Sequence, residues 1–371
     1  MLALNGIMKI AHLTTVHTRS DTRIFRKMCR SLAAAGHDVT LLVADGLGDG
    51  LIDGVRIIDV GRPSGRLARA CWATARMWWL ALRTRPDILH FHDPELIPGG
   101  LVVRLAGWRV VYDIHEYYRV HLRATASLPR PVSAMLANVY GAAERWAALV
   151  LDACVVCAPN MQHVLPLRRS ILMENYPLAK EFRPGPMPAA ERPTRVCCVG
   201  ILSTIRCVSE MVDAAATAGA TLALAGKWYP ESLRTEVVAR PGWAGVEELG
   251  YIDRQQIQEL FDASRAGLLI LDLHQDEVHV SSNKLFEYMA AGLPVIVSDI
   301  GFARDIIGRH GCGLLVSPSN DASALAAAVG WILAHPEKAD RMGRAGRRAI
   351  ETGYSWDQQM PSLLALYESL R

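Results

Sequence analysis

Residues 281–301 read SSNKLFEYMAAGLPVIVSDIG, and this stretch contains both kinds of element that decide the fold. Three small polar residues at its start are favourable N-caps for a helix over Lys284–Ala291. Gly292 suits the left-handed position that ends a helix, and the apolar run Leu293–Ser298 predicts a buried strand. A helix that leads directly into a buried strand is typical of a parallel sheet covered by helices.

Short apolar runs alternate with helical patterns on both sides of this stretch. Further strands are predicted at residues 9–16, 38–43, 55–60, 88–91, 110–112, 153–157, 195–199, 221–225, 247–249, 267–271 and 313–316. Helical patterns lie between them, as at Arg23–Ala35 and Ser323–Ala334. This alternation predicts an α/β fold with doubly wound parallel sheets, covered by helices on both faces.

Residues 177–193, PLAKEFRPGPMPAAERP, contain five prolines and almost no periodicity, as expected of a stiff interdomain linker. The linker separates an N-terminal Rossmann-like domain over residues 1–176 from a C-terminal one over residues 194–354. Two such domains are expected to face each other across a cleft, where the carboxyl ends of both sheets bind ligands. Residues 355–371 predict a final helix that crosses back to the N-terminal domain, with Pro361 as a kink.

The composition is that of an ordinary globular protein, because 51% of the 371 residues are hydrophobic and 21% are charged. This excludes a disordered or collagen-like chain. The net charge of +3 is far below the basic excess of a typical nucleic-acid-binding domain, so no nucleic acid partner is expected. No apolar run reaches the roughly 18 residues that cross a bilayer, and the first residues lack the features of a secretion signal. The expected location is therefore cytoplasmic.

The first turn of the 284–291 helix is a candidate anion site. Free backbone amides at a helix start attract anions, and Lys284 adds a positive charge on the same turn. Glu287 lies one turn inside the helix, where a carboxylate can accept hydrogen bonds from the hydroxyl groups of a ribose. From the spacing alone, an ordinary capped helix with a solvated Glu–Lys pair is an equal alternative.

The same stretch resembles the donor-site segment of the retaining glycosyltransferases of family four (glycosyl transferases group 1), which have the two-domain GT-B fold. The resemblance covers nearly the whole chain, through DTRIFRKMCRSLAAAGHDVTLLV, YDIHEYY, CVGILSTIRCVSEMVDAA, LALAGKW and ELGYID. It implies that a hexosyl group is moved from a nucleotide sugar to a glycan or lipid-linked acceptor, with retention at the anomeric carbon. It also implies a setting in bacterial surface-polysaccharide synthesis.

The resemblance assigns donor-binding roles in the C-terminal half. Glu287 matches the family glutamate that binds the ribose, whereas the position of a second family glutamate is occupied by His279. The family's diphosphate-binding pair is a basic residue directly after a strand glycine and a lysine soon after it. Here an isoleucine follows Gly200 and Arg206 takes the lysine position, so Lys284 is the expected substitute for the missing cation. The donor-binding set is Gly200, Arg206, Gly226, Lys227, Tyr251, Ile252, His279, Ser281, Ser282, Asn283, Lys284 and Glu287.

In the N-terminal half, His115 in the run YDIHEYY matches a family histidine near the reacting sugar. It follows a predicted strand, and an imidazole there can exchange hydrogen bonds with sugar hydroxyls while Asp113 or Glu116 orients it. A structural histidine bonded to the backbone is the alternative. The expected catalytic set is His115, Glu116, Arg206 and Lys284. Candidate contacts to the acceptor or the diphosphate are Arg19, Asp21 and Arg23, which follow the first strand.

No metal ion or other cofactor is expected. No two aspartates are spaced Asp-x-Asp, the motif with which transferases of another fold hold a diphosphate through a divalent cation. Arg206, Lys284 and the amides around Asn283 would then stabilise the charge that grows on the leaving diphosphate. The run from His90 to Asp93 has metal-ligand residue types, but its alternation is also what the end of a strand produces.

Residues 62–85, RPSGRLARACWATARMWWLALRTR, contain six arginines, three tryptophans and no acidic residue. Helical spacing aligns Arg62, Arg66, Arg69, Arg76 and Arg83, with Trp72 and Trp79 beside them. Such a stripe favours binding to anionic lipid headgroups, which implies a peripheral position on the inner face of the cytoplasmic membrane. The alternative is a helix packed on the sheet through Leu67, Cys71, Thr74 and Trp78, with a solvated basic face.

Two other functions stay open on the sequence. A nucleotide-sugar epimerase of the same fold would convert the donor without an acceptor. A non-catalytic scaffold would bind a nucleotide but leave every donor intact, and the departures at Ile201 and His279 favour this alternative.

Overall fold

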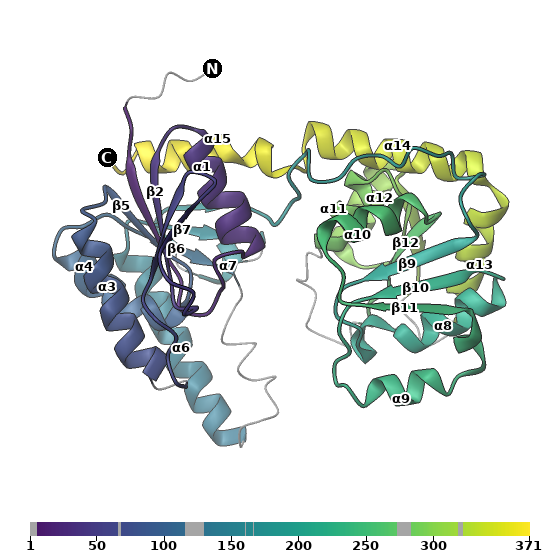
Figure 1. The fold of residues 1–371 in the computed structure, drawn as a ribbon, viewed down its shortest axis with the longest axis horizontal. Coiled ribbons are helices and arrows are strands. Elements are labelled where there is room, and N and C mark those ends of the chain that lie inside the picture. Colours follow the sequence, from purple (N-terminus) through teal and green to yellow (C-terminus); the bar gives the residue numbers. More distant parts are fainter. Residues whose placement is uncertain are drawn as a thin grey trace. The chain divides into compact units, whose positions relative to one another are not determined.

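The computed structural model describes residues 6–65, 68–115, 130–159, 161–165, 167–272, 283–317 and 322–371 (Figure 1). It divides into an N-terminal unit, Met1–Asn175 with Gln359–Arg371, and a C-terminal unit, Tyr176–Gln358. Each unit is a sheet with helices on both faces (Figure 1). No helix within the described ranges is long and apolar enough to span a membrane.

The N-terminal unit contains an eight-stranded sheet in the order β3-β4-β2-β1-β5-β6-β7-β8. Its strands are β1 (Lys9–Leu13), β2 (Asp38–Val43), β3 (Gly50–Ile52), β4 (Val55–Asp59), β5 (Ile88–Phe91), β6 (Val110–Ile114), β7 (Ala153–Val156) and β8 (Ser170–Leu172). Among the described strands of this sheet, β3 alone pairs antiparallel, with β4. The two edge strands β3 and β8 were not predicted, because neither has a buried residue and so neither leaves an apolar run in the sequence.

The helices of this unit cover two chemically different faces of the sheet. They are η1 (Thr22–Cys29), α1 (Arg30–Ala34), η2 (Arg69–Ala73), α3 (Thr74–Arg83), η3 (Pro94–Leu96), α4 (Ile97–Leu105), α6 (Arg130–Val150), α7 (Met161–Val164) and α15 (Trp356–Glu368). One face is apolar, where Phe91 and Tyr112 pack in a core with Trp78 of α3. The other face carries the buried polar side chains of Asp113 and His90, which contact Arg23 of η1 and Tyr367 of α15. This second face holds the candidate chemistry of the unit.

The C-terminal unit contains a six-stranded parallel sheet in the order β11-β10-β9-β12-β13-β14. Its strands are β9 (Arg195–Val199), β10 (Thr221–Ala225), β11 (Val246–Gly250), β12 (Ala266–Leu269), β13 (Val295–Ser298) and β14 (Gly313–Val316). Its helices are η4 (Thr204–Arg206), α8 (Val208–Thr217), α9 (Leu233–Val238), η5 (Pro241–Gly245), α10 (Arg254–Asp262), α11 (Asn283–Ala290), α12 (Gly301–His310), α13 (Ala322–Ala334) and α14 (Pro336–Thr352). Apolar cores on both faces of the sheet hold these helices in place.

The proline-rich stretch 177–193 is part of the C-terminal unit. Phe182 is buried in its core, and Arg347 of α14 donates to the carbonyl oxygens of Ala179 and Phe182. Arg265 donates to the carbonyl oxygen of Arg192 at the other end of the stretch. These contacts fix most of the stretch to one unit.

Candidate functional site

The glycines that follow β9 and β10 bring two backbone segments of the C-terminal unit into close contact. Gly200 and Gly226 both have positive φ angles, +135° and +150°. A Cβ atom on Gly226 would lie 1.6 Å from the carbonyl oxygen of Gly200, so no other residue fits there. The result is a surface of bare backbone at the carboxyl edge of the sheet, where α/β proteins bind ligands.

Two cations lie over this glycine surface. An ideal Cβ on Gly200 would be 2.7 Å from Nη1 of Arg206 and 3.8 Å from Cε of Lys284. Arg206 ends the η4 turn after β9, and Lys284 lies on the first turn of α11. No carboxylate among the described residues forms an ion pair with Arg206. Chain segments far apart in sequence thus converge on one positively charged surface.

Glu287 organises the second cation. Its side chain is only 7% exposed, and its two oxygens accept hydrogen bonds from Lys284 Nζ at 2.6 Å and Arg254 Nη1 at 3.0 Å. Burial by itself would raise the pKa of Glu287, but the charges of Lys284 and Arg254 bring it below its usual value. Glu287 is therefore ionised at neutral pH, and a carboxylate has lone pairs left for ligand hydroxyls.

Tyr288 anchors α11 in the position that this surface requires. It is fully buried, and its hydroxyl oxygen accepts a hydrogen bond from the Val199 amide of β9. Its ring packs over Gly267 of β12, where a Cβ atom would lie 2.5 Å away. The first turn of α11 is thereby held beside the ends of β9 and β12.

The other predicted donor residues are distributed around this surface. Lys227 and Tyr251 follow β10 and β11, and the Lys227 ammonium lies 5.6 Å from the centroid of the Tyr251 ring. Tyr251 is 80% exposed, which leaves a face free for stacking with a base, while Ile252 packs partly buried against the core. Asn283 is the first residue of α11. The predicted site residues Glu116, His279, Ser281 and Ser282 lie outside the described residues.

In the N-terminal unit, a buried ion pair occupies the centre of the polar face. Arg23 donates through Nε and Nη2 to the two oxygens of Asp113, at 2.9 and 2.8 Å. The Arg23 and Asp113 side chains are 6% and 0% exposed. Burial by itself would raise the pKa of Asp113, but Arg23 and the neighbouring histidines hold it well below its usual range. Asp113 is therefore a fixed negative charge at the end of β6.

A chain of imidazoles runs from this carboxylate. Oδ2 of Asp113 lies 2.7 Å from His115 Nε2 and 3.1 Å from His92 Nδ1, and His92 Nε2 lies 2.9 Å from His12 Nδ1. The ionised carboxylate only accepts, so Nδ1 of the neutral His92 donates to it and Nε2 accepts from His12. This leaves Nε2 of His12 a buried lone pair, without a hydrogen-bond partner among the described residues. The same carboxylate orients the ring of His115, as the sequence suggested for Asp113.

A second carboxylate shapes the loop after β1. Asp93 is 2% exposed, and its Oδ2 accepts from the hydroxyl group of Thr14 and the amides of Thr15 and Val16. His17 at the tip of this loop lies between Asp93 and Asp21, at 3.6 and 3.4 Å. The rings of His17 and His115 are 5.3 Å apart. Two partly exposed imidazoles, each beside buried or half-buried carboxylates, therefore stand next to each other.

Arg19, Asp21 and Arg23 were expected to contact the acceptor or the diphosphate, but in the structure all three make contacts within the protein. Arg19 forms a bidentate ion pair with Asp45, and Arg23 is occupied by Asp113. Asp21 accepts hydrogen bonds from the first amides of η1, including that of Arg23, and so caps that helix. Neither guanidinium is free for an anion. Their function in the structure is to hold the loop and the imidazole chain.

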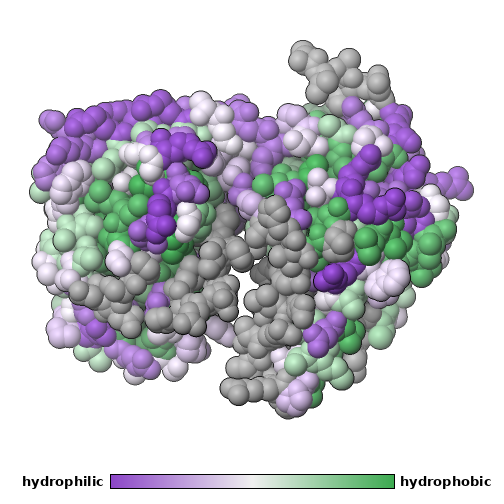
Figure 2. Space-filling view, turned by 180° about the vertical axis from the view of Figure 1, so that it is seen from behind, coloured by the Kyte–Doolittle hydropathy of each residue, from purple (hydrophilic) through white to green (hydrophobic). Residues whose placement is uncertain are grey.

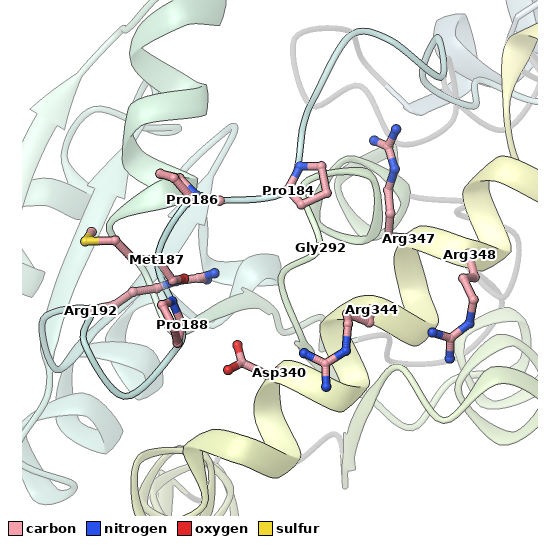
Figure 3. Close-up of a pocket in the computed structure, with 11 residues that line it drawn as sticks. Pro184, Pro186, Met187, Pro188, Arg192, Gly292, Asp340, Arg344, Arg347 and Arg348 are labelled. Atoms are coloured by element: carbon pink, nitrogen blue, oxygen red, sulfur yellow. The ribbon is translucent and has the colours of Figure 1, made fainter.

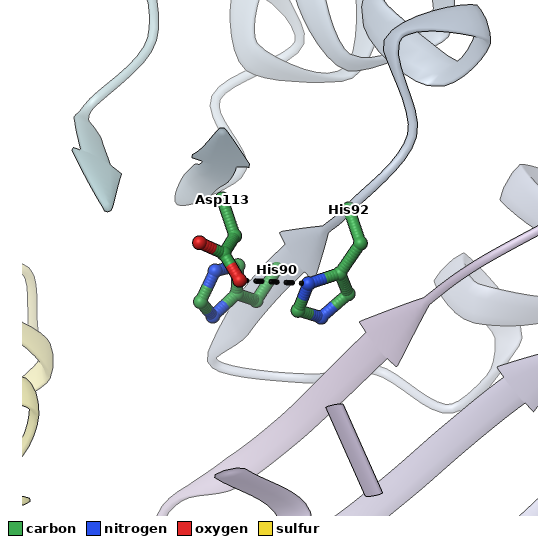
Figure 4. Close-up of side chains that lie close together, drawn as sticks. All are labelled: His90, His92 and Asp113. Atoms are coloured by element: carbon green, nitrogen blue, oxygen red, sulfur yellow. Dashed lines mark hydrogen bonds and ion pairs between the residues drawn. The ribbon is translucent and has the colours of Figure 1, made fainter. Parts of the chain in front are cut away.

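His90, His92 and Asp113 present ligand-type atoms within 4.8 Å of one another (Figure 4). The run from His90 to Asp93 thus contributes two histidines to a cluster of metal-ligand type, while Asp93 points to the loop. However, both oxygens of Asp113 already contact the Arg23 guanidinium. A divalent cation bound there would face a fixed positive charge at contact distance. The cluster fits a hydrogen-bond network better than a metal centre.

Comparison with known proteins identifies the family. A model described as Glycosyltransferase Family 4 matches residues 22–168, and one described as Glycosyl transferases group 1 matches residues 181–349. The chain belongs to the family-four glycosyltransferases of the GT-B fold. The fold class and the family expected from the sequence are therefore confirmed, and the protein is a glycosyltransferase.

Individual relatives agree with this assignment. A glycogen synthase of Mycobacterium tuberculosis is 24% identical over 91% of this chain and 88% of its own length. A phosphatidyl-myo-inositol mannosyltransferase of Mycobacterium leprae is 25% identical over 76% of this chain and 74% of its own. The structure of HepE from Anabaena, determined with UDP-glucose, superposes with a TM-score of 0.72 at 14% identity, covering 96% of this chain and 99% of that one. At that identity the structure supports the fold alone.

Several residues of these two groups were missed by sequence reasoning. Arg254, the second partner of Glu287, lies on α10 and has no local signal in the sequence. His17, His92 and Asp93 reach the group around His115 only because β1, β5 and β6 are neighbours in the sheet. One signal in the sequence could have indicated these residues. Several polar residues directly follow predicted strands, and parallel strands all end at the same edge of their sheet.

The imidazole chain predicts that the N-terminal unit loses stability in mild acid. Burial lowers the pKa of His12, His90 and His92 below its usual value, so the unfolded state binds more protons below about pH 6.5. Stability should then fall with decreasing pH, by up to about 1.4 kcal/mol per pH unit for each histidine. His17 acts in the opposite sense, because Asp21 and Asp93 raise its pKa although burial would lower it.

The pH dependence of this stability is measured by hydrogen exchange of the β1 and β5 amides at pH 7.5, 6.5 and 5.5, with the rates corrected for intrinsic exchange. Opening free energies should decrease from each pH to the next, and His12→Asn should reduce the slope. His335→Asn in the C-terminal unit is the matched control and should leave the slope unchanged. Opening free energies that stay constant down to pH 5.5 would contradict neutral buried imidazoles.

Proposed function

We propose that this glycosyltransferase binds a nucleoside diphosphate sugar on its C-terminal unit and transfers the sugar with retention. The observation that carries the proposal is the pair of cations, Arg206 and Lys284, held over the bare backbone of Gly200. Backbone amides, a helix start and two cations are the features that recognise a diphosphate. Glu287 is placed one turn away to accept hydrogen bonds from the ribose, and Tyr251 offers a ring to the base.

The chemistry follows from this charge arrangement. When the bond between the anomeric carbon and the diphosphate oxygen breaks, negative charge grows on the leaving diphosphate. Arg206 and Lys284 are fixed beside that charge, so they stabilise the transition state more than the ground state. The acceptor hydroxyl attacks the same face, its oxygen bonds to the anomeric carbon, and its proton goes to the departing phosphate. Fixed protein cations supply the positive charge in this scheme, so the proposed reaction is metal-independent.

The N-terminal group is proposed to serve the sugar and acceptor. His115 is oriented by Asp113, so that its Nδ1 atom is presented as a lone pair to a sugar hydroxyl. His17 offers a second imidazole beside it. The proposed acceptor is a glycan or a lipid-linked glycan in bacterial surface-polysaccharide synthesis. The names of the relatives, which include a polysaccharide synthase and a lipid mannosyltransferase, support acceptors of this range.

Product analysis tests the proposal against its alternatives. The purified protein is incubated with UDP- and GDP-sugars, with and without oligosaccharide or lipid-linked acceptors, and NMR reports the anomeric configuration of the product. Transfer that requires an acceptor and keeps the donor's configuration is expected. Conversion of a donor alone would favour the epimerase, inversion would contradict the retaining scheme, and an intact donor with every acceptor would favour the scaffold.

The surface of α3 supports an additional proposal, binding to an anionic membrane. Arg76 and Arg83 lie over the rings of Trp72 and Trp79, which are 49% and 56% exposed. Arg69, by contrast, is paired with Glu95. Arg62 precedes the helix, and Arg66 and Leu67 lie outside the described residues. The predicted stripe is therefore shorter than the sequence suggested.

The sequence also allowed a helix that packs on the sheet and only exposes a basic face, and the structure agrees with this alternative in part. Thr74 and Trp78 are buried as that alternative required, but Cys71 is exposed. Neighbouring α6 exposes apolar side chains too, with Met135, Val139 and Trp146 between 58% and 64% exposed. Apolar groups reach the surface of the N-terminal unit on the face shown in Figure 2 as well, on the right.

Acidic residues are almost absent from these helices. Within the described parts of η2, α3, α4 and α6 the one acidic residue is Glu144, which is buried. Exposed tryptophans and arginines without exposed carboxylates match the chemistry of an anionic lipid surface. The proposed working place is accordingly the inner face of the cytoplasmic membrane.

Charge reversal on α3 tests the membrane proposal. The double variant Arg76→Glu/Arg83→Glu should lose most of its binding to vesicles rich in phosphatidylglycerol, since each cation near such a surface contributes about 1 kcal/mol. Co-sedimentation measures the bound fraction. The matched control Arg26→Glu/Arg309→Glu changes the net charge equally at other exposed arginines and should keep binding. If both double variants bind like the original protein, α3 is not the contact surface.

A further inference from the structure

A cavity of about 440 Å³ lies within the C-terminal unit, away from the glycine surface (Figure 3). One wall is the stretch Pro184–Pro188, and the opposite wall is the middle of α14, with Gly292 between them. The volume is in the range of small-molecule sites. No function discussed above uses this cavity.

Four arginines line the cavity against one acidic residue, Asp340. Arg347 is structural, because it donates at 2.7 Å to the carbonyl oxygens of Phe182 and Ala290. Asp340 accepts from the amide of Ala189. Arg344 and Arg348 are exposed, and their guanidinium groups form no hydrogen bond or ion pair with any part of the chain that the structure describes.

The two unpaired arginines stand one helical turn apart on α14. Like charges at this spacing destabilise a helix. Asp340 lies one turn before Arg344 on the same helix but forms no ion pair with either arginine in the described part of the chain, so an anion beside the two arginines would relieve their repulsion. Figure 3 shows both side chains extending from the same helix at the cavity.

A third cation faces the cavity from the other wall. Arg192 is 6% exposed, and its guanidinium donates to the carbonyl oxygens of Met187 and Ser264. No carboxylate among the described residues accepts a hydrogen bond from it. These carbonyl dipoles solvate its buried charge, and the carboxylates of Asp340 and Asp262 also act on it. Its side chain lies on the cavity wall (Figure 3).

The two walls differ in chemistry. Guanidinium groups match the oxygen geometry of phosphate through paired hydrogen bonds. The opposite wall, with three prolines and Met187, has few free donors and suits the apolar part of a ligand. The combination favours a phosphate carried on a small organic body over free inorganic phosphate.

We infer that this cavity is a binding site for a small organic phosphate, held by Arg344 and Arg348 and packed against Pro184–Pro188. The site is separate from the diphosphate surface of Arg206 and Lys284, and its existence does not depend on the proposed reaction. The cavity is connected to α11, the helix that carries Lys284, because the cavity residue Arg347 donates a hydrogen bond to the carbonyl oxygen of Ala290 at the end of α11. Ligand binding is therefore expected to stabilise the C-terminal unit.

Titration calorimetry of the full chain with phenyl phosphate tests the inference. Inorganic phosphate and phenol are titrated separately, because each represents only one part of that ligand. Phenyl phosphate should bind at one site, more tightly than inorganic phosphate, and phenol should not bind. The double variant Arg344→Gln/Arg348→Gln should raise Kd at least about tenfold, the loss expected when charge-assisted hydrogen bonds disappear. The control Arg309→Gln/Arg341→Gln removes two exposed charges outside the cavity and should leave Kd unchanged.

Binding in this cavity must be distinguished from binding at the proposed donor site, because the donor site is also expected to attract phosphate. Phenyl phosphate is therefore titrated into Arg206→Ala, which should bind it as the original protein does. Binding that Arg206→Ala abolishes and the α14 double variant keeps would place the ligand at the donor site and overturn the inference. Absence of saturable binding to the original protein would overturn it as well, whatever the outcome for nucleotide sugars.

Discussion

Replacing Asp113 by asparagine should destabilise the N-terminal unit by about 3–5 kcal/mol, the cost of removing one partner of a buried ion pair. Arg23 would keep its charge in a site where its side chain is 6% exposed. The amide of asparagine can accept from one guanidinium nitrogen, but its own NH2 group would face the other nitrogen and the ring of His92. Urea unfolding, followed by hydrogen exchange of the β5 and β6 amides, measures the loss.

The matched control is the exposed pair of Arg30 and Asp53 in the same unit, whose side chains are 47% and 52% exposed. Asp53→Asn should change stability by less than about 1 kcal/mol, because exposed ion pairs contribute little. Asparagine also tolerates the positive φ of 50° at this position. Equal effects of the two substitutions would show that the Asp113–Arg23 pair has no special stabilising role.

The second large effect is expected on turnover. Replacing Arg206 by alanine should lower kcat by about 100- to 1000-fold, the loss typical of removing one group aimed at transition-state charge. Lys284→Ala should have an effect of similar size, and it also leaves Glu287 with Arg254 as its remaining cation. KM for the donor should change less than kcat, since the charge develops as the bond breaks.

Steady-state kinetics with the preferred donor measures both constants, and thermal unfolding checks that the variants are folded. Arg304→Ala is the control, because Arg304 is a 61% exposed cation of the same unit that is paired with Asp299. Its kcat should stay within about twofold of the original value. A loss confined to KM in Arg206→Ala would assign Arg206 to ground-state binding instead.

The C-terminal half of the candidate site could largely be predicted from the sequence, because its signals are local. Gly200 and Gly226 directly follow apolar runs, and Lys284 and Glu287 share one helix, so strand ends and helical spacing are enough to group them. The structure adds contacts that residue spacing does not predict. The two oxygens of Glu287 accept hydrogen bonds from Lys284 and Arg254, and the hydrogen bond between Tyr288 and Val199 positions α11 on the sheet.

The N-terminal half could be predicted only in part, because its contacts depend on strand order. Arg23 and Asp113 are 90 residues apart, and nothing local in either segment indicates their pairing. A basic residue after a strand therefore suggested a free cation where the structure has a buried ion pair. The same reason explains His12 and His92, whose contact follows from the adjacency of β1 and β5.

The α3 surface illustrates a third limit. Helical spacing aligned the arginines of residues 62–85, but it does not show where the helix begins or which cation is already paired. Arg69 is paired with Glu95 from another segment, and this contact leaves no signal in the helical spacing.

In the proposed function, the C-terminal unit holds a nucleoside diphosphate through Arg206 and Lys284. Titration calorimetry with UDP, GDP, ADP and dTDP tests it most directly, on the original protein and on Arg206→Ala/Lys284→Ala. Saturable binding of at least one of these nucleotides at a single site is expected, with the double variant losing that binding. Nucleotide binding that survives in the double variant, or no binding of any of the four to the original protein, would contradict the account.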